Sequence, residues 1–137
     1  MATFKRFEDI KAWQLARELT YQVHILCDKP AMTKRFALKD QLCRAAMSAM
    51  SNVAEGYSRS TDKDFAHFLD MARGSAMEVQ SHLYIVRDLK LGDEETVKAL
   101  YTKAGETAAK ITSLAQYLRK TRPKASGSSS SKALAND

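Results

Sequence analysis

The sequence has few of the residues that interrupt regular structure or support covalent and metal chemistry. Its 137 residues include five glycines, two prolines and two cysteines. Glycine and proline both fall below average use, so few turns and long helices are expected. Cys27 and Cys43 show neither a CxxC pair nor metal-ligand spacing, which indicates free thiols in a reducing compartment. No Gly-rich phosphate loop or nucleophile elbow occurs, and no cofactor or metal is predicted.

Long apolar runs are also missing. No segment approaches the roughly eighteen consecutive apolar residues of a membrane span, and the N-terminus lacks the apolar core of a signal peptide. We therefore predict a cytoplasmic protein without a membrane partner. A chain of 137 residues is long enough for one domain with a substantial core.

The net charge of +6 is unevenly distributed. From Arg119 onward, five basic residues and one acidic residue give +4, whereas residues 1–118 hold 17 basic and 15 acidic residues, or +2. The body of the protein is thus nearly balanced, and most of the excess lies near the C-terminus. A clustered basic segment of this kind suits contacts with phosphates, although a tail that only aids solubility is an equal alternative.

Apolar residues recur in steps of three and four along four segments, which predicts four helices. The first covers residues 7–27 and the second residues 34–57, with Thr33 as its expected N-cap. The third begins after an expected N-cap at Thr61 and stops at Gly92, and the fourth follows an N-cap at Asp93.

Short connections make sequential helices antiparallel, so the predicted fold is an all-α, up-down-up-down four-helix bundle formed by residues 1–121. Residues 122–137 are rich in serine, include a proline and a glycine, and cannot bury enough apolar surface to become ordered, so we expect a disordered basic tail.

The second helix is predicted to be apolar over about half its circumference, wider than a single bundle face needs. One interpretation is deep burial within the bundle. The other, which we favour, is that the second apolar edge packs against another subunit. The small residues on this helix permit close approach of helices; they include Ala45, Ala46, Ala49 and Ala54.

Three motifs resemble those of the bacterial four-helix-bundle family named for the 23S rRNA intervening sequence. The stretch FEDIKAWQLARELT is similar to the family's F-E-D-L-x-x-W-Q-x-A opening, and SAMSNVAEG to its S-x-P-x-N-I-A-E-G signature, with Met50 where proline is common. KDFAHFLDMARGSAMEVQSHL resembles the third-helix pattern K-x-F-x-x-F-L-x-x-A-x-G-S-x-x-E-x-x-x-x-L. The likeness covers residues 7–119.

The resemblance implies a homo-oligomer, typically a pentameric ring. Relatives include accessory proteins of diversity-generating retroelements, which bind nucleic acid and a reverse transcriptase. The family has no established catalytic residues, so the resemblance supplies none to this chain.

Two groups of residues are candidate binding sites. The first is a nucleic-acid-binding cluster near the C-terminus: Arg119, Lys120, Arg122 and Lys124. The second is a polar seam along the second helix, which we expect to face a subunit boundary or the lumen of a ring, or else solvent. Its residues are Arg44, Ser48, Ser51, Asn52 and Glu55.

One catalytic alternative remains open. Arg17 and His24 are spaced as in the ribonuclease motif of the HEPN helical-bundle family, and seven residues place them on one helical face. Chance occurrence is the more frequent explanation. His67 and His82 are about 22 Å apart along the helix and cannot share a metal.

The leading prediction is a non-enzymatic, homo-oligomeric binding or scaffold protein, with RNA or DNA as the favoured ligand. The alternatives are a small RNA-processing ribonuclease that uses Arg17 and His24, and an adaptor that binds only proteins.

Overall fold

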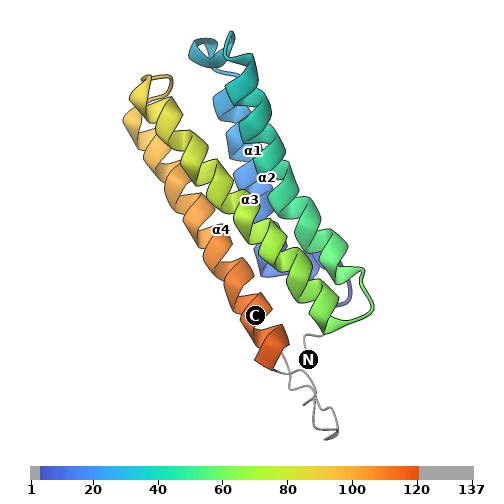
Figure 1. Ribbon diagram of the computed structural model, residues 1–137. Coiled ribbons are helices and arrows are strands. Elements are labelled where there is room, and N and C mark those ends of the chain that lie inside the picture. The colour runs from blue at the N-terminus through green and yellow to red at the C-terminus, as the bar shows by residue number, and fades with distance from the viewer. Residues whose placement is uncertain (1–3, 121–137) are drawn as a thin grey trace, which may run out of the picture.

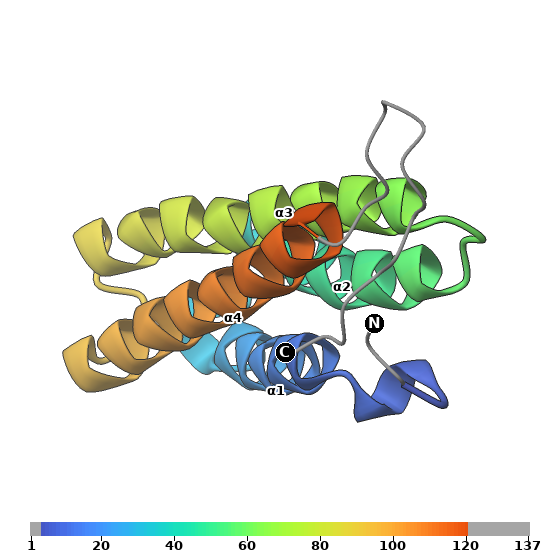
Figure 2. The ribbon, with the colours of Figure 1, turned by 90° about the horizontal axis from the view of Figure 1, so that it is seen from below.

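The computed structural model describes residues 4–120. Four long helices form an antiparallel up-down-up-down bundle (Figures 1 and 2): α1, Lys11–Cys27; α2, Phe36–Tyr57; α3, Asp62–Asp88; α4, Glu94–Lys120. Each helix packs against its neighbours in sequence, and α4 also packs against α1, which closes the bundle. The predicted fold class is confirmed, whereas the expected tail, residues 122–137, lies outside the described residues.

The helix ends show which capping predictions hold. The Thr61 side chain accepts a hydrogen bond from the Asp64 amide at 3.1 Å, and Asp93 accepts one from the Thr96 amide at 2.6 Å, as predicted. Thr33 does not cap α2. It follows a 3-10 helix, η2 (Pro30–Met32), and α2 begins at Phe36 without a side-chain cap.

The end of α3 also differs from the prediction. The helix ends at Asp88, and Lys90 rather than Gly92 adopts the left-handed conformation, with φ of 57°. The Leu91 amide reaches back to the Val86 carbonyl at 2.9 Å, so the chain turns in a Schellman-type motif. A side chain at Gly92 would lie 3.1 Å from Leu26, so this glycine serves packing.

The first predicted helix is divided. A short 3-10 helix, η1 (Phe7–Asp9), precedes α1, and Ile10 between them is fully buried. The Tyr57 hydroxyl donates to the Phe4 carbonyl at 2.7 Å and holds the N-terminal segment against the end of α2.

The broad apolar arc of α2 is mostly used inside the chain. Its central residues are buried, and five more pack partly buried against the core; these are Leu38, Cys43, Met50, Ala54 and Tyr57. Of the large apolar side chains of α2, Met47 stays 48% exposed, and Phe36, at the start of the helix, stays 74% exposed. The width of the arc therefore reflects packing between α1 and α3, and it is not evidence for a subunit contact by itself.

Candidate functional site

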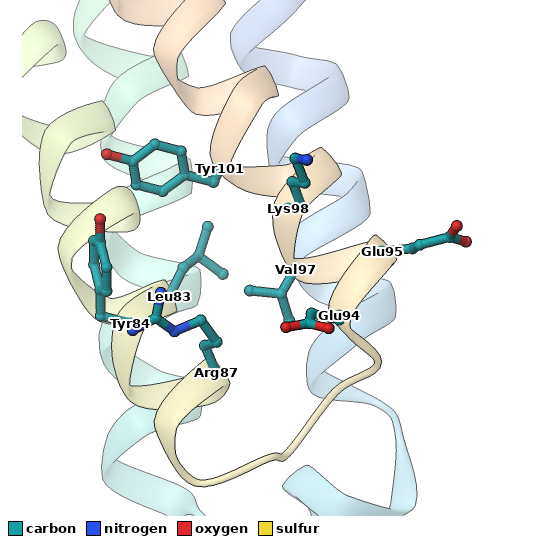
Figure 3. Close-up of a pocket in the computed structure, with 8 residues that line it drawn as sticks. All are labelled: Leu83, Tyr84, Arg87, Glu94, Glu95, Val97, Lys98 and Tyr101. Carbon is teal, nitrogen blue, oxygen red and sulfur yellow. The ribbon is translucent and has the colours of Figure 1, made fainter.

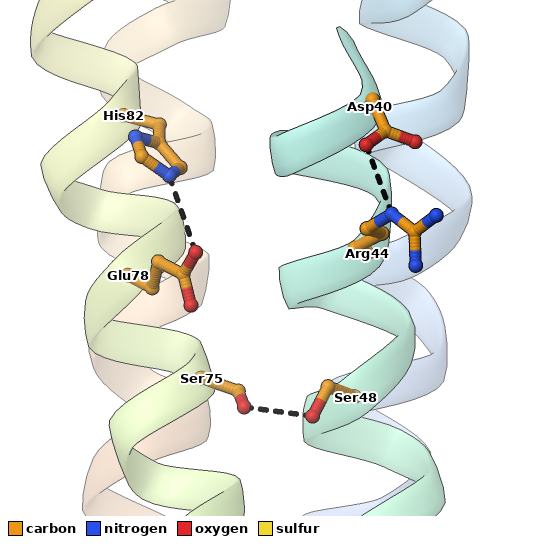
Figure 4. A network of polar contacts seen from close by, with 6 residues as sticks. All are labelled: Asp40, Arg44, Ser48, Ser75, Glu78 and His82. Atoms are coloured by element: carbon orange, nitrogen blue, oxygen red, sulfur yellow. Dashed lines mark hydrogen bonds and ion pairs between the residues drawn. The ribbon is translucent and has the colours of Figure 1, made fainter. Parts of the chain in front are cut away.

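The predicted polar seam separates into two parts. The half-buried Ser48 accepts a hydrogen bond from Ser75 of α3 at 2.9 Å (Figure 4). It accepts another from Asn52 at the same distance. The other three residues lie on the outer surface of α2. Ser48 thus joins α2 to α3 within one chain through a hydroxyl–hydroxyl contact, and Asn52 supports Ser48 from the same helix.

The exposed part of the seam is neutralised within the chain. Arg44 pairs with Asp40 at 2.9 Å, and Glu55 pairs with Arg59 at 3.2 Å, each across one helical turn. The Ser51 hydroxyl donates to the Met47 carbonyl at 2.9 Å. The outer surface of α2 therefore presents polar groups whose charges are already compensated.

Sequence reasoning missed a second stripe, on α3. Residues 71, 75, 78, 82, 85 and 89 recur in steps of four and three beside α2, outside the core stripe that the sequence revealed. Three of them are exposed apolar side chains: Met71 at 39%, Ile85 at 42% and Leu89 at 48%. The signal was present as a second four-three pattern in the same helix, which a single-stripe search overlooks.

Polar residues occupy the middle of this stripe. His82 lies 3.3 Å from the carboxylate of Glu78, and Glu78 is itself one turn along the helix from Ser75 (Figure 4). Together with the outer surface of α2, the stripe forms what we call the α2–α3 face: Arg44, Met47, Ser48, Ser51, Met71, Ser75, Glu78, His82, Ile85 and Leu89. It combines exposed apolar side chains with internally paired polar groups, the composition expected of a helix-packing surface.

The predicted nucleic-acid cluster is only partly described. Arg119 donates to the Asp70 carboxylate through both terminal guanidinium nitrogens, at 2.6 and 3.1 Å. This hydrogen bonding with Arg119 lowers the pKa of Asp70. Lys120 is exposed, while Arg122 and Lys124 lie outside the described residues. Arg119 is therefore engaged with α3 in the free chain.

The two residues of the catalytic alternative each have a local contact. The Arg17 guanidinium lies 5.7 Å from the centre of the Trp13 ring, and His24 donates through Nδ1 to the Thr20 carbonyl at 2.9 Å. Both side chains are exposed on α1. Within residues 4–120, no three histidine, cysteine or carboxylate side chains are grouped as metal ligands.

A pocket of about 550 Å³ lies between the end of α3 and the start of α4 (Figure 3). Leu83 and Val97 form its apolar base, and the rings of Tyr84 and Tyr101 meet edge to face at 5.7 Å. The remaining residues at the pocket are Arg87, Glu94, Glu95 and Lys98. With two basic and two acidic side chains, the pocket has no net preference for an anion.

Most aromatic residues near the N-terminus pack against the core rather than face solvent. Trp13 is buried and meets Phe7 edge to face at 5.1 Å, and Phe4 packs partly buried against the same core. Tyr21 differs, because 67% of it is exposed.

Comparisons with known proteins agree with this architecture. One solved structure, a protein of unknown function from the S23 ribosomal protein family of Bacteroides thetaiotaomicron VPI-5482, superposes with a TM-score of 0.71 at 17% identity. The match covers 77% of this chain and 98% of that one, and it supports the fold alone.

No protein with a curated description matches. None of the helices in the part of the chain that the structure describes is long and apolar enough to cross a membrane. Residues 8–113 match the model of the 23S rRNA-intervening sequence protein, and the chain therefore belongs to that family.

Proposed function

We propose that this protein is a non-enzymatic, cytoplasmic scaffold that assembles into a homo-oligomer, with five subunits as the favoured number, and binds RNA or DNA. The observation that carries the assembly is the α2–α3 face. Met47, Met71, Ile85 and Leu89 are each at least 39% exposed, although α2 and α3, on which or directly after which they lie, have well-filled core stripes. Burying such side chains against another copy removes apolar area from water.

The polar groups of the same face support this assignment. Asp40 and Arg44 are paired, as are Ser48 and Ser75, and Glu78 lies next to His82. A second copy can cover the Asp40–Arg44 pair without leaving a lone charge buried, which would be costly, and Glu78 keeps a hydrogen-bond partner in His82. Small residues help, because nothing lies within 4 Å of a side-chain carbon placed at Gly74 on the exposed side of α3.

Native mass spectrometry and size-exclusion chromatography at low salt test the assembly. The Ile85→Glu variant places an unpaired carboxylate in the α2–α3 face and is expected to shift the protein to a monomer. Tyr21→Glu is the matched control, since Tyr21 is exposed on α1 and lies outside that face. A wild-type monomer, or an Ile85→Glu protein of unchanged mass, contradicts the proposal.

Binding to nucleic acid is tested separately. Affinity for an oligonucleotide should fall steeply as salt increases, because neutralised phosphates release counterions. Deletion of residues after Thr121 should weaken binding through loss of Arg122 and Lys124. If purified protein instead cleaves RNA and His24→Ala abolishes the cleavage, the ribonuclease alternative replaces this proposal. Salt-insensitive behaviour without bound nucleic acid indicates the protein adaptor.

A further inference from the structure

Residues 29–39, which connect α1 to α2 and form the first turn of α2, contain four basic residues and no acidic one. We call this segment the basic connection. We propose that it is an ordered site for single-stranded nucleic acid, in which Lys34 and Arg35 contact phosphates and Phe36 stacks on a base. The inference rests on the proposed nucleic-acid binding and locates it in the fold.

The cations of the basic connection are available. Among the residues that the structure describes, none of Lys29, Lys34, Arg35 and Lys39 forms an ion pair, whereas six other basic side chains do; those six are Arg6, Arg44, Arg59, Arg87, Lys103 and Arg119. Asp40, directly after the segment, is taken by Arg44. A phosphate that approaches Lys34 or Arg35 therefore does not have to displace a carboxylate.

Lys29 is the least free of the four. The pKa of Asp93 is lowered mainly by its hydrogen bonding with Thr96, and the charge of Lys29 adds a small part. Lys39 is half-buried, and its ammonium group lies 3.5 Å from the Thr33 carbonyl. Lys34 and Arg35 are exposed and are the residues assigned to phosphate contact.

Phe36 is the most exposed large hydrophobic side chain in residues 4–120, at 74%. Lys39 lies over the same ring, 5.9 Å from its centre. An aromatic ring flanked by unpaired cations matches the way proteins bind single strands, with bases stacked on rings and phosphates on basic side chains. In a duplex the bases are already stacked on each other, so no base face is free to stack on the Phe36 ring.

The segment is held in place by the core. Met32 is fully buried, and backbone hydrogen bonds join Met32 to Lys29, Thr33 to Pro30 and Arg35 to Met32 at 2.9 to 3.1 Å. Little conformational freedom is lost when such a segment binds a ligand.

Two other partners fit the segment less well. If Phe36 packed against another copy of the chain, the unpaired cations of the basic connection would be buried in the subunit interface, at a high electrostatic cost. Anchoring on an anionic membrane needs more exposed apolar surface than Phe36, Ala31 and Ala37 supply.

The test measures binding of full-length protein to fluorescein-labelled single-stranded RNA and DNA, and to a duplex of equal length, over a salt series. Phe36→Ala is expected to weaken single-strand binding about fivefold or more and to leave duplex binding unchanged. Lys34→Gln with Arg35→Gln should reduce the slope of log affinity against log salt by about 1.4, the value for two phosphates of a single strand. Phe36→Trp should retain affinity, and its added fluorescence should be quenched when the strand binds.

The matched control is Lys63→Gln with Arg73→Gln, two exposed α3 cations that form no ion pair within the described residues. If wild-type protein binds and the Phe36 and Lys34/Arg35 variants behave like this control, the basic connection is not the site, while the proposed function stands. If wild-type protein binds no oligonucleotide, the proposed function itself fails.

Two further results overturn the assignment. One is a change of oligomer mass in Phe36→Ala, which places Phe36 at a subunit boundary. The other is co-sedimentation with phosphatidylglycerol vesicles that Phe36→Ala abolishes while oligonucleotide binding is unaffected.

Discussion

The two ends of the bundle differ in whether particular basic side chains form ion pairs. At the end that carries both termini (Figure 1), three arginines from separate parts of the chain are each paired with a carboxylate: Arg6 with Asp9, Arg59 with Glu55, and Arg119 with Asp70. At the opposite end, where α1 joins α2, Lys34 and Arg35 have no ion-pair partner in residues 4–120. These three arginines are thus satisfied internally, whereas Lys34 and Arg35 are open to a ligand.

The cores beneath these ends differ as well. The terminal end has an aromatic core that includes Trp13 and Phe65, and Arg59 lies 4.6 Å from the centre of the Phe68 ring. The opposite end has an aliphatic and sulfur-containing core that includes Cys27 and Met32. Its most exposed aromatic residue, Phe36 at 74%, is the one assigned above to base stacking. Which cations can bind a partner therefore depends on whether a carboxylate of the folded chain already pairs with them, and the net charge does not show this.

Met32→Ala should have the largest effect on the difference between the two ends, because it removes the buried side chain that holds the basic connection against the core. We expect the free energy of unfolding to fall by about 2 to 5 kcal/mol. Urea denaturation followed by far-UV circular dichroism and by Trp13 fluorescence measures it, since Trp13 is the sole tryptophan and lies in the opposite core cluster. Both midpoints should fall together because the same four helices span both ends.

An unchanged fluorescence midpoint with a lowered dichroism midpoint would show that the ends unfold separately. Ala31→Ser is the control: Ala31 is exposed in the same 3-10 helix, so its effect should stay within about 0.5 kcal/mol.

Oxidation of Cys27 and Cys43 should stabilise the end of the bundle where α1 joins α2. The sulfur atoms of Cys27 and Cys43 lie 3.7 Å apart. Diamide, which takes two electrons and two protons from a pair of thiols, is expected to join them and to raise the free energy of unfolding by up to about 3 kcal/mol through loop closure. Mass spectrometry should show the loss of two hydrogens, and thermal unfolding should show the gain.

The order of reaction follows from burial. Desolvation, reinforced by Cys43, raises the pKa of Cys27 to about 12, so this thiol stays protonated at pH 8. The half-buried Cys43 therefore reacts first, and Cys27 then closes the disulfide. Cys43→Ser should gain no stability with diamide, and rapid alkylation of Cys27 in native Cys43→Ser would contradict its burial.

Gly56→Ala tests how tightly the terminal end is packed. The new methyl group would lie 2.8 Å from the Phe68 Cβ and 2.9 Å from the Phe65 ring, so the helices must separate. We expect a loss of about 1 to 3 kcal/mol in the free energy of unfolding. Gly74→Ala is the matched variant, because the space there is open, and it should stabilise α3 by up to about 1 kcal/mol. Equal effects from both substitutions would disprove the close contact at Gly56.

The sequence predicted the fold because core packing follows helical periodicity, which is local in the chain. Nearly every expected core position of α3 is buried, and the caps at Thr61 and Asp93 formed as expected. Periodicity misleads where a residue that fits the apolar stripe of a helix packs at the surface instead of in the core. The Tyr101 position continues the apolar stripe of α4, yet this residue is 38% exposed, because its ring packs against Tyr84 at the surface.

The candidate sites were less predictable because they depend on contacts between distant residues. The Arg119–Asp70 pair joins residues 49 apart, and the Ser48–Ser75 contact joins residues 27 apart. Neither pattern exists within one helix, so the sequence presented Arg119 as a free cation and Ser48 as part of a continuous seam. The basic connection was visible in the sequence, but its lack of partners was not.

Asp70→Asn gives the smallest effect and tests the internal pairing of the terminal end. Because the Arg119 contact lowers the pKa of Asp70, the pair stabilises the fold above the pKa of a free aspartate and loses its effect as pH falls through the lower native pKa. Both partners are about half exposed, at 45% and 50%, so the loss at pH 7 should be below about 1 kcal/mol. Urea denaturation of both proteins from pH 7 to strongly acidic pH measures this difference, which should vanish in acid. Asp70→Asn also frees Arg119, so oligonucleotide affinity should rise slightly at low salt; an unchanged affinity would mean that pairing does not limit this arginine.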